Sequence, residues 1–131
     1  GDILKIPAEL DQPIYMDGVK VFGKAIKEMI RSLEDASAEA GIDLNDLNLI
    51  IPHQANQRII TAMRQHKKKK KEKVYSNIKH LGNTSSSTIP LCLDEVRKDP
   101  GFTGKGTRIG LTAFGGGFTF GGAVLETVRQ K

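Results

Sequence analysis

The sequence is organised around a short apolar run, which reads Leu47-Asn48-Leu49-Ile50-Ile51-Pro52. A run of this kind is typical of a strand buried on both faces, as in a parallel sheet covered by helices. His53-Gln54-Ala55-Asn56 follows directly, and after it Ile59, Ile60 and Met63 recur at helical spacing. The stretch therefore predicts a buried strand, a polar turn and a helix in succession.

Upstream of this run, the sequence predicts a brief strand and then a long amphipathic helix. Ile3 to Ile6 predicts the strand, which Pro7 ends, and residues 8–16 predict a loop. Asp17 is the expected N-cap of the helix, and Gly41 is the glycine expected at its C-terminal end. The apolar residues between them share one face. They are Phe22, Ala25, Ile26, Met29, Ile30 and Leu33.

Downstream, the pattern predicts one more short strand and one more helix. Val74 to Asn77 predicts the strand, and His80 to Thr88 predicts a polar loop. The helix is expected from about Ser86 to Lys98, with Pro90 in its first turn, where proline is tolerated. Cys92 lies on the apolar stripe of that helix, so we expect it to be a small core residue and not a nucleophile.

The last third of the chain is rich in glycine and predicts two closing strands. Arg108 to Ala113 and Phe118 to Val128 predict the strands, and Gly115-Gly116-Gly117 joins them. A connection this short cannot make a parallel crossover, so we expect the final pair to be antiparallel. Together the elements predict an α/β fold: a mixed, mostly parallel sheet with an antiparallel final strand and helices on both faces. The 131 residues suit a single domain, residues 1–131.

Composition narrows the classes of function. No apolar run approaches the ~20 residues that span a bilayer, and the N-terminus lacks the layout of a signal peptide. We therefore expect no association with a membrane and a cytoplasmic location. The single cysteine allows no internal disulfide framework and no cysteine-based zinc site, and no other metal motif is present, so we expect no metal.

The charge is distributed unevenly along the chain. Residues 1–46 carry five basic and ten acidic side chains, whereas residues 47–131 carry fifteen basic and five acidic ones. Five of the positive charges form the run Lys67 to Lys71, which is either a solvated loop or a docking patch for an acidic partner. Only 5% of the residues are aromatic and none is interleaved with these lysines, which argues against nucleic acid as the partner.

Functional groups of α/β sheets collect just past the carboxyl ends of strands. This rule points to His53 after the first strong strand, to Asn83 after the Val74 strand, and to the backbone amides of Gly115-Gly116-Gly117. Each has a structural alternative. His53 could be a hydrogen-bonded structural residue, Asn83 a turn residue and the three glycines a tight connection. Asn56 could likewise be a helix N-cap and nothing else.

Four motifs occur in an order and spacing that match one enzyme family. They are Met16-Asp17-Gly18 with Val21-Phe22, His53-Gln54-Ala55-Asn56, Gly82-Asn83-Thr84-Ser85, and Phe114-Gly115-Gly116-Gly117-Phe118-Thr119. In this arrangement the chain resembles β-ketoacyl-acyl-carrier-protein synthase III. The resemblance covers essentially the whole chain but only the C-terminal half of that family's subunit. It implies half of a thiolase-like fold, whose full subunit contains two similar halves.

The resemblance also implies roles for individual residues. His53 and Asn83 match two members of the family's Cys-His-Asn site, where they stabilise the enolate oxygen formed when malonyl-acyl-carrier protein is decarboxylated. Gly116 matches an oxyanion-hole amide, and Phe114 matches an aromatic residue beside the histidine. Arg58 matches a basic residue that guides the acidic carrier protein. The positions near the coenzyme A arm are Gly18, Phe22, Ala55 and Asn56.

The implied reaction is the decarboxylative Claisen condensation of an acyl-CoA, expected to be acetyl-CoA, with malonyl-acyl-carrier protein at the start of fatty acid biosynthesis. No covalently bound cofactor is expected. The expected partners are the acyl carrier protein, the N-terminal half of the enzyme and a second copy in a homodimer. The nucleophilic cysteine belongs to the N-terminal half, so we expect this chain alone to be inactive. The alternatives are a thiolase-fold acyltransferase of secondary metabolism and a non-catalytic domain that docks carrier protein.

Overall fold

The computed structural model describes residues 4–5, 15–16, 18–66 and 74–128. Its main sheet has three strands in the order β3 (Leu49–Pro52), β4 (Arg108–Gly115) and β5 (Thr119–Glu126). β3 and β4 are parallel, and β4 and β5 are antiparallel. A single parallel bridge from Val74 to Ile50 extends the sheet beyond β3. The mixed sheet with an antiparallel final strand is therefore as the sequence predicts.

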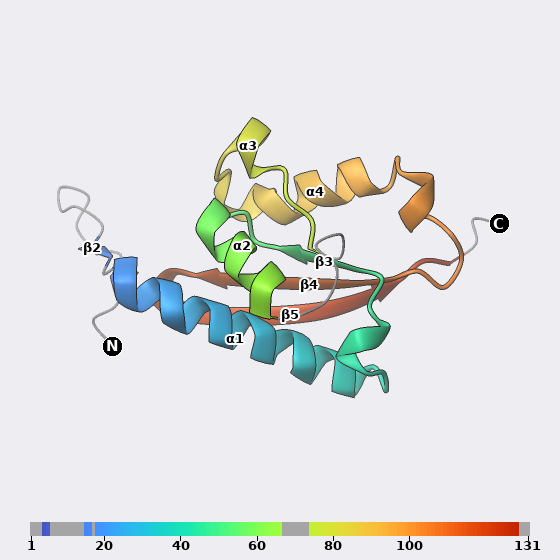
Figure 1. The fold of residues 1–131 in the computed structure, drawn as a ribbon, viewed down its shortest axis with the longest axis horizontal. Coiled ribbons are helices and arrows are strands. Elements are labelled where there is room, and N and C mark those ends of the chain that lie inside the picture. Colours follow the sequence, from blue (N-terminus) through green and yellow to red (C-terminus); the bar gives the residue numbers. More distant parts are fainter. Residues whose placement is uncertain (1–3, 6–14, 17, 67–73, 129–131) are drawn as a thin grey trace.

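Helices cover both faces of this sheet (Figure 1). α1 (Gly18–Glu39) lies along β4 and β5, and α2 (Gln57–His66) packs beside it. α4 (Thr88–Val96) lies on the opposite face, against β3. The buried apolar side chains accordingly form two clusters. The α1–α2 side holds Ala25, Met29, Leu33, Leu47, Ile50, Ile59, Ile60, Met63 and Val74, and the α4 side holds Leu49, Ile51, Cys92, Val96 and Ile109.

β3 and α1 illustrate how local sequence produces these layers. All four residues of β3 are buried, as expected for a strand covered on both faces. α1 ends in paired backbone hydrogen bonds, from Gly41 N–H to the Ala38 carbonyl (3.0 Å) and from Ile42 N–H to the Ser37 carbonyl (3.0 Å). Gly41 has φ +69°, the left-handed conformation that this ending requires. The predicted C-terminal glycine is confirmed, whereas the predicted N-cap Asp17 lies outside the described residues.

The packing of α1 on the sheet depends on one glycine of β5. A Cβ added to Gly122 would overlap the backbone carbonyl of Ser32 in α1. The same atom added to Gly121 would meet nothing within 4 Å. Gly122 therefore allows the helix backbone to approach the strand closely.

Two expectations about shorter elements are wrong. Tyr15–Met16 is strand β2 and not loop, because it pairs antiparallel with β1 (Leu4–Lys5), which lies within the predicted first strand. The expected strand Val74 to Asn77 is a single bridge at Val74, because α3 (Ile78–Leu81) starts immediately after Asn77. The described 3₁₀ helices are η1 (Leu44–Asp46), η3 (Ser85–Ser87), η4 (Pro100–Phe102) and η5 (Gly116–Phe118). Among the described helices, none has the length and apolar character needed to cross a bilayer.

Candidate active site

His53 is fixed at the carboxyl end of β3. Its backbone N–H donates to the Thr112 carbonyl of β4 at 2.7 Å, which holds the residue against the neighbouring strand. Its ring lies edge-on to Phe114, with 5.7 Å between the ring centroids. Nδ1 lies 2.6 Å from the hydroxyl oxygen of Thr88, the first residue of α4. The imidazole is therefore held from two sides, and no residue that the structure describes makes a hydrogen bond to Nε2.

The Thr88 hydroxyl determines which imidazole nitrogen carries the proton. Thr88 is 2% exposed, and Nδ1 of His53 is the one partner of its hydroxyl among the described residues. If Nδ1 carried the proton, the hydroxyl proton would be buried without an acceptor. Thr88 therefore donates to Nδ1, and Nε2 carries the proton of the neutral ring. Burial also lowers the pKa of His53, which favours this neutral form.

Asn83 is oriented by the turn that contains it. Gly82, at φ +70°, redirects the chain after α3, and the Asn83 side-chain oxygen accepts the N–H of Ser85 at 2.9 Å. With its oxygen engaged in the turn, the amide nitrogen points the other way and donates to the Ala55 carbonyl at 3.4 Å. Asn83 thus makes the hydrogen bond of a turn residue, and the turn orients its N–H₂ donor toward the segment that follows His53.

The loop that carries Asn83 is connected to β3 by a residue that the sequence analysis missed. Gln54 is fully buried and donates to the Pro52 carbonyl at 2.7 Å, while its side-chain oxygen accepts the N–H of Asn77 at 3.1 Å. Glu95 of α4 secures the same segment, since it accepts hydrogen bonds from the Tyr75 hydroxyl (2.6 Å) and the Asn77 amide (3.2 Å). Burial and Glu95 together raise the pKa of Tyr75. The available signal for Gln54 was a polar side chain directly after a buried strand.

His53 and Asn83 line the same cavity, of about 190 Å³. Six of the nine predicted site residues line this cavity. The residues that line it are Val21, Phe22, His53, Ala55, Asn56, Ile59, Asn83 and Phe114. A second cavity of about 560 Å³ shares His53 and Phe114 with the first and extends to Gly115 and Phe120 of the closing strand pair.

The three other predicted residues lie around these cavities, not among their lining residues. Gly116 follows Gly115, which lines the second cavity. Gly18 is the first residue of α1, one turn before Phe22. The Arg58 guanidinium lies over the Phe22 ring, 5.8 Å from its centroid. Asn56 also acts as the predicted N-cap of α2, because its side-chain oxygen accepts the Arg58 N–H at 2.7 Å.

Comparison with known proteins identifies the family of this chain. The family model described as 3-oxoacyl-[acyl-carrier-protein (ACP)] synthase III C terminal matches residues 37–127. The chain belongs to the β-ketoacyl-acyl-carrier-protein synthase III family. Its relatives include the synthase III of Clostridium acetobutylicum, 39% identical over 116 residues, and that of Nitratidesulfovibrio vulgaris strain DP4, 43% identical over 113 residues. These alignments cover 88% and 86% of this chain and 35% and 34% of the relatives.

Solved synthase III structures have the same fold. The enzyme from Pseudomonas aeruginosa PAO1 superposes with a TM-score of 0.85 at 35% identity, over 98% of this chain and 40% of that one. The Aquifex aeolicus VF5 enzyme gives a TM-score of 0.83 at 38% identity, over 97% and 40% of the two chains. The predicted fold class, the C-terminal half of a thiolase-like fold, is confirmed. The chain spans about a third of the length of the curated synthase III relatives.

Cys92 does not belong to the candidate synthase III site. It is fully buried in the α4-side core, and it lines neither of the cavities that contain His53. Burial, with a smaller contribution from Glu95, raises the pKa of the thiol to about 12. The thiolate, which is the nucleophilic form, is therefore strongly disfavoured near neutral pH. Within the described residues, no group of three or more His, Cys, Asp and Glu side chains could hold a metal ion.

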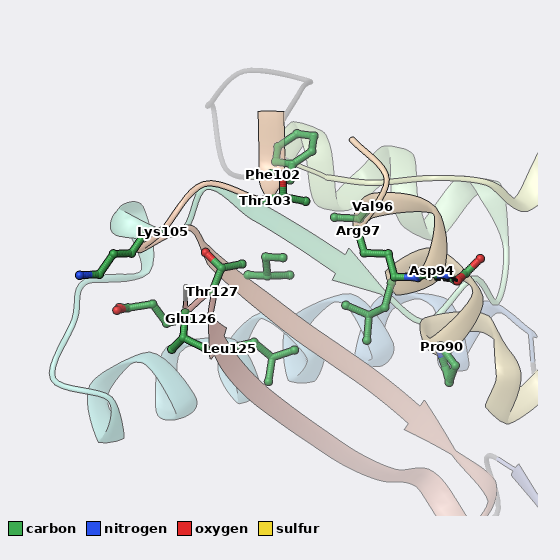
Figure 2. A pocket seen from close by; sticks show the side chains of 13 residues that line it. Pro90, Asp94, Val96, Arg97, Phe102, Thr103, Lys105, Leu125, Glu126 and Thr127 are labelled. Atoms are coloured by element: carbon green, nitrogen blue, oxygen red, sulfur yellow. Dashed lines mark hydrogen bonds and ion pairs between the residues drawn. The ribbon is translucent and has the colours of Figure 1, made fainter. Parts of the chain in front are cut away.

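A larger, mainly apolar groove of about 1040 Å³ runs along α4, from Pro90 to Arg97 (Figure 2). α4, η4 and the end of β5 form its walls, and it shares no lining residue with the His53 cavities. Leu125, at 42% exposure, and Val128, at 82%, leave apolar surface open there. The part of the chain that the structure describes therefore contains an apolar surface that is not covered.

Proposed function

We propose that this chain forms the C-terminal half of a condensing enzyme that joins an acyl-CoA, expected to be acetyl-CoA, to malonyl-acyl-carrier protein and so starts fatty acid biosynthesis. One observation carries the proposal: His53, whose Nδ1 is engaged by Thr88, and Asn83 line one small cavity. The Nε2–H of His53 and the amide of Asn83 are then two neutral donors there. None of the described residues that line this cavity is acidic, so nothing there repels a developing negative charge.

The two donors suit the stabilisation of an enolate. The malonyl thioester oxygen accepts a hydrogen bond from each of them. When the bond to the carboxylate carbon breaks, carbon dioxide leaves and the electron pair moves into an enolate whose oxygen carries the charge. Both hydrogen bonds strengthen as that charge develops, so they favour the transition state over the bound substrate. The enolate carbon then attacks the acyl thioester carbonyl, forming a carbon–carbon bond and releasing the cysteine thiolate of the N-terminal half.

The surroundings of the donors support this chemistry. Thr88 holds His53 in the tautomer that donates from Nε2, and the side chains of Phe22, Ile59 and Phe114 make the cavity wall apolar. An apolar wall excludes water and strengthens hydrogen bonds to the charged oxygen. Gly116, next to the second cavity, is proposed to donate its amide to the oxygen of the acyl thioester.

The residues around Phe22 are proposed to border the entrance for the pantetheine arm. Gly18, Phe22, Ala55 and Asn56 would contact that arm, and Arg58, which lies over the Phe22 ring, would attract the acidic carrier protein. The lysines 67–71 lie outside the described residues, and their contribution to docking stays a prediction.

The apolar groove of Figure 2 supports the expectation that residues 1–131 form one domain of a larger subunit. We propose that the N-terminal half of the enzyme covers this groove and supplies the nucleophilic cysteine, and that the completed subunit forms a homodimer. On this proposal the isolated chain forms neither an acyl-enzyme nor a condensation product, because its one thiol, Cys92, is buried and lines neither cavity that contains His53.

Mass spectrometry and product analysis test the proposal. The chain is incubated with acetyl-CoA and malonyl-acyl-carrier protein, alone and joined to the N-terminal half of a synthase III relative. We expect an acyl adduct and a β-ketoacyl product from the joined protein alone. A stable adduct on Cys92 of the isolated chain, with turnover, would contradict the proposal. Acyl transfer without condensation by the joined protein would favour the acyltransferase alternative, and carrier binding without either reaction would favour a docking domain.

A further inference from the structure

A polar cavity outside the proposed site lies between α2 and α3 and has a volume of about 440 Å³. α2 contributes residues one and two turns apart, and the segment from Ser76 through α3 supplies the opposite wall. The lining residues are Gln57, Thr61, Arg64, Ser76, Lys79 and His80. It shares none of them with the cavities that contain His53, so the proposed condensation does not account for this cavity.

The neutral side chains of this cavity form a hydrogen-bonded chain with a spare donor at its end. The Ser76 hydroxyl donates to the side-chain oxygen of Gln57 at 3.2 Å, and the Gln57 amide nitrogen donates to the Thr61 hydroxyl oxygen at 3.4 Å. Gln57 thus has both of its polar atoms engaged. The hydroxyl proton of Thr61 has no acceptor among the described residues, so it is available to a ligand.

The charged side chains add further spare donors. Arg64 donates from Nε and Nη2 to the Val74 carbonyl, at 3.1 and 2.8 Å, which fixes its guanidinium plane. Among the described residues, none accepts a hydrogen bond from the remaining N–H groups of that guanidinium, so they can bind a ligand. Lys79 and His80 are exposed on α3, and within the described residues no carboxylate pairs with Arg64, Lys79 or His80. No Asp or Glu is among the described residues that line the cavity.

We propose that this α2–α3 cavity is a binding site for a phosphate group. Donors approach from both walls: Thr61 and Arg64 on one side, Lys79 and His80 on the other. A carboxylate has two oxygens, whereas a phosphate offers a third and a charge near −2, so it satisfies more of these donors at once. The phosphate could be free inorganic phosphate or a phosphate of a coenzyme A-type molecule. The inference rests on the donors of this cavity and not on the proposed reaction.

The probe is inorganic phosphate, titrated into the 131-residue chain at constant ionic strength and followed by backbone amide NMR. We expect saturable shifts confined to the amides around Thr61, Lys79 and His80. Lys79→Glu should weaken phosphate binding on the order of tenfold or more, and Thr61→Val by a few fold. Lys105→Glu is the matched control: it makes the same change of charge at an exposed lysine in the groove of Figure 2, and it should leave phosphate affinity unchanged.

The same titration with coenzyme A and with 3′-dephospho-coenzyme A separates the sources of phosphate. If coenzyme A shifts these amides and the dephospho form does not, the 3′-phosphate is the natural occupant. If neither coenzyme shifts them while inorganic phosphate does, the site takes free phosphate. Non-saturable shifts, or equal weakening by Lys79→Glu and Lys105→Glu, would overturn the proposal. Either result would leave the proposed condensation unaffected, because no reaction is measured.

Discussion

Replacing Thr88 with Val removes the one hydroxyl that holds the His53 ring while leaving the side chain similar in shape. The Thr88–His53 hydrogen bond is 2.6 Å long and Thr88 is 2% exposed, so water has little access to replace it. Leaving a buried polar atom unpaired costs about 1–3 kcal/mol, and we expect the free energy of unfolding to fall by that amount. Thr88→Ser keeps the hydroxyl and should lose less.

The imidazole tautomer provides the sharper readout of the same substitution. In the unmodified chain at neutral pH, ¹⁵N NMR of His53 should show the proton predominantly on Nε2, with a minor population on Nδ1. Thr88→Val removes about 0.5–1.5 kcal/mol of preference for that tautomer, so the population with a proton on Nδ1 should rise about twofold to tenfold. Thr88→Ser should restore the original ratio. A proton predominantly on Nδ1 in the unmodified chain, or tautomer populations unchanged by Val, would refute the positioning role, whatever happens to stability.

Three further predictions concern packing, reactivity and pH. Gly122→Ala forces a Cβ against the Ser32 carbonyl and should lower the free energy of unfolding by about 1–3 kcal/mol. Gly121→Ala is the control, because a Cβ there meets nothing within 4 Å, and it should change the free energy little. Equal losses for the two variants in urea denaturation would contradict the close approach of α1. Cys92, with its pKa raised to about 12, should resist alkylation by iodoacetamide at pH 8 in the folded chain and react in urea. Rapid alkylation without denaturant would show that the thiol is accessible and would contradict its burial. Burial lowers the pKa of His53, so as the pH falls His53 is protonated in the unfolded chain before it is protonated in the folded chain. The free energy of unfolding should therefore decline as the pH falls from about 6.5 toward the lower pKa of the folded chain. His53→Gln should show less decline over the same pH range.

The main elements of the fold could be predicted because their signals are local. The apolar run at residues 49–52 and the helical stripe of α1 each depend on neighbours in sequence, as does the end of that helix at Gly41. Tyr15–Met16 could not be recognised as a strand, because its strand character comes from pairing with Leu4–Lys5. Val74 to Asn77 has strand-forming residues, but the buried Gln54 side chain takes the Asn77 N–H, and a helix starts after it.

The candidate site, like the fold, could be predicted from the sequence only in part. His53 could be chosen because it follows β3. Asn83 could be chosen because a strand is expected at Val74 to Asn77, where the structure has a single bridge and then α3, yet the structure still brings both residues to one cavity. Their supporting residues could not be found from sequence patterns: Thr88 lies 35 residues from His53, and Gln54 bonds the Asn77 backbone 23 residues away. No periodicity relates positions so far apart, so contacts of this kind require the folded chain.

The rate of malonyl decarboxylation is the decisive measurement for the proposed enolate site. It is made on the chain joined to an N-terminal half that carries the nucleophilic cysteine, by measuring carbon dioxide release from malonyl-acyl-carrier protein. His53→Ala and Asn83→Ala should each lower that rate by about 10²–10³, the usual cost of losing one donor to a developing oxyanion. Acyl transfer from acetyl-CoA to the cysteine should change less, which controls for folding. Decarboxylation that continues at the original rate in both variants would show that these two residues do not stabilise the enolate.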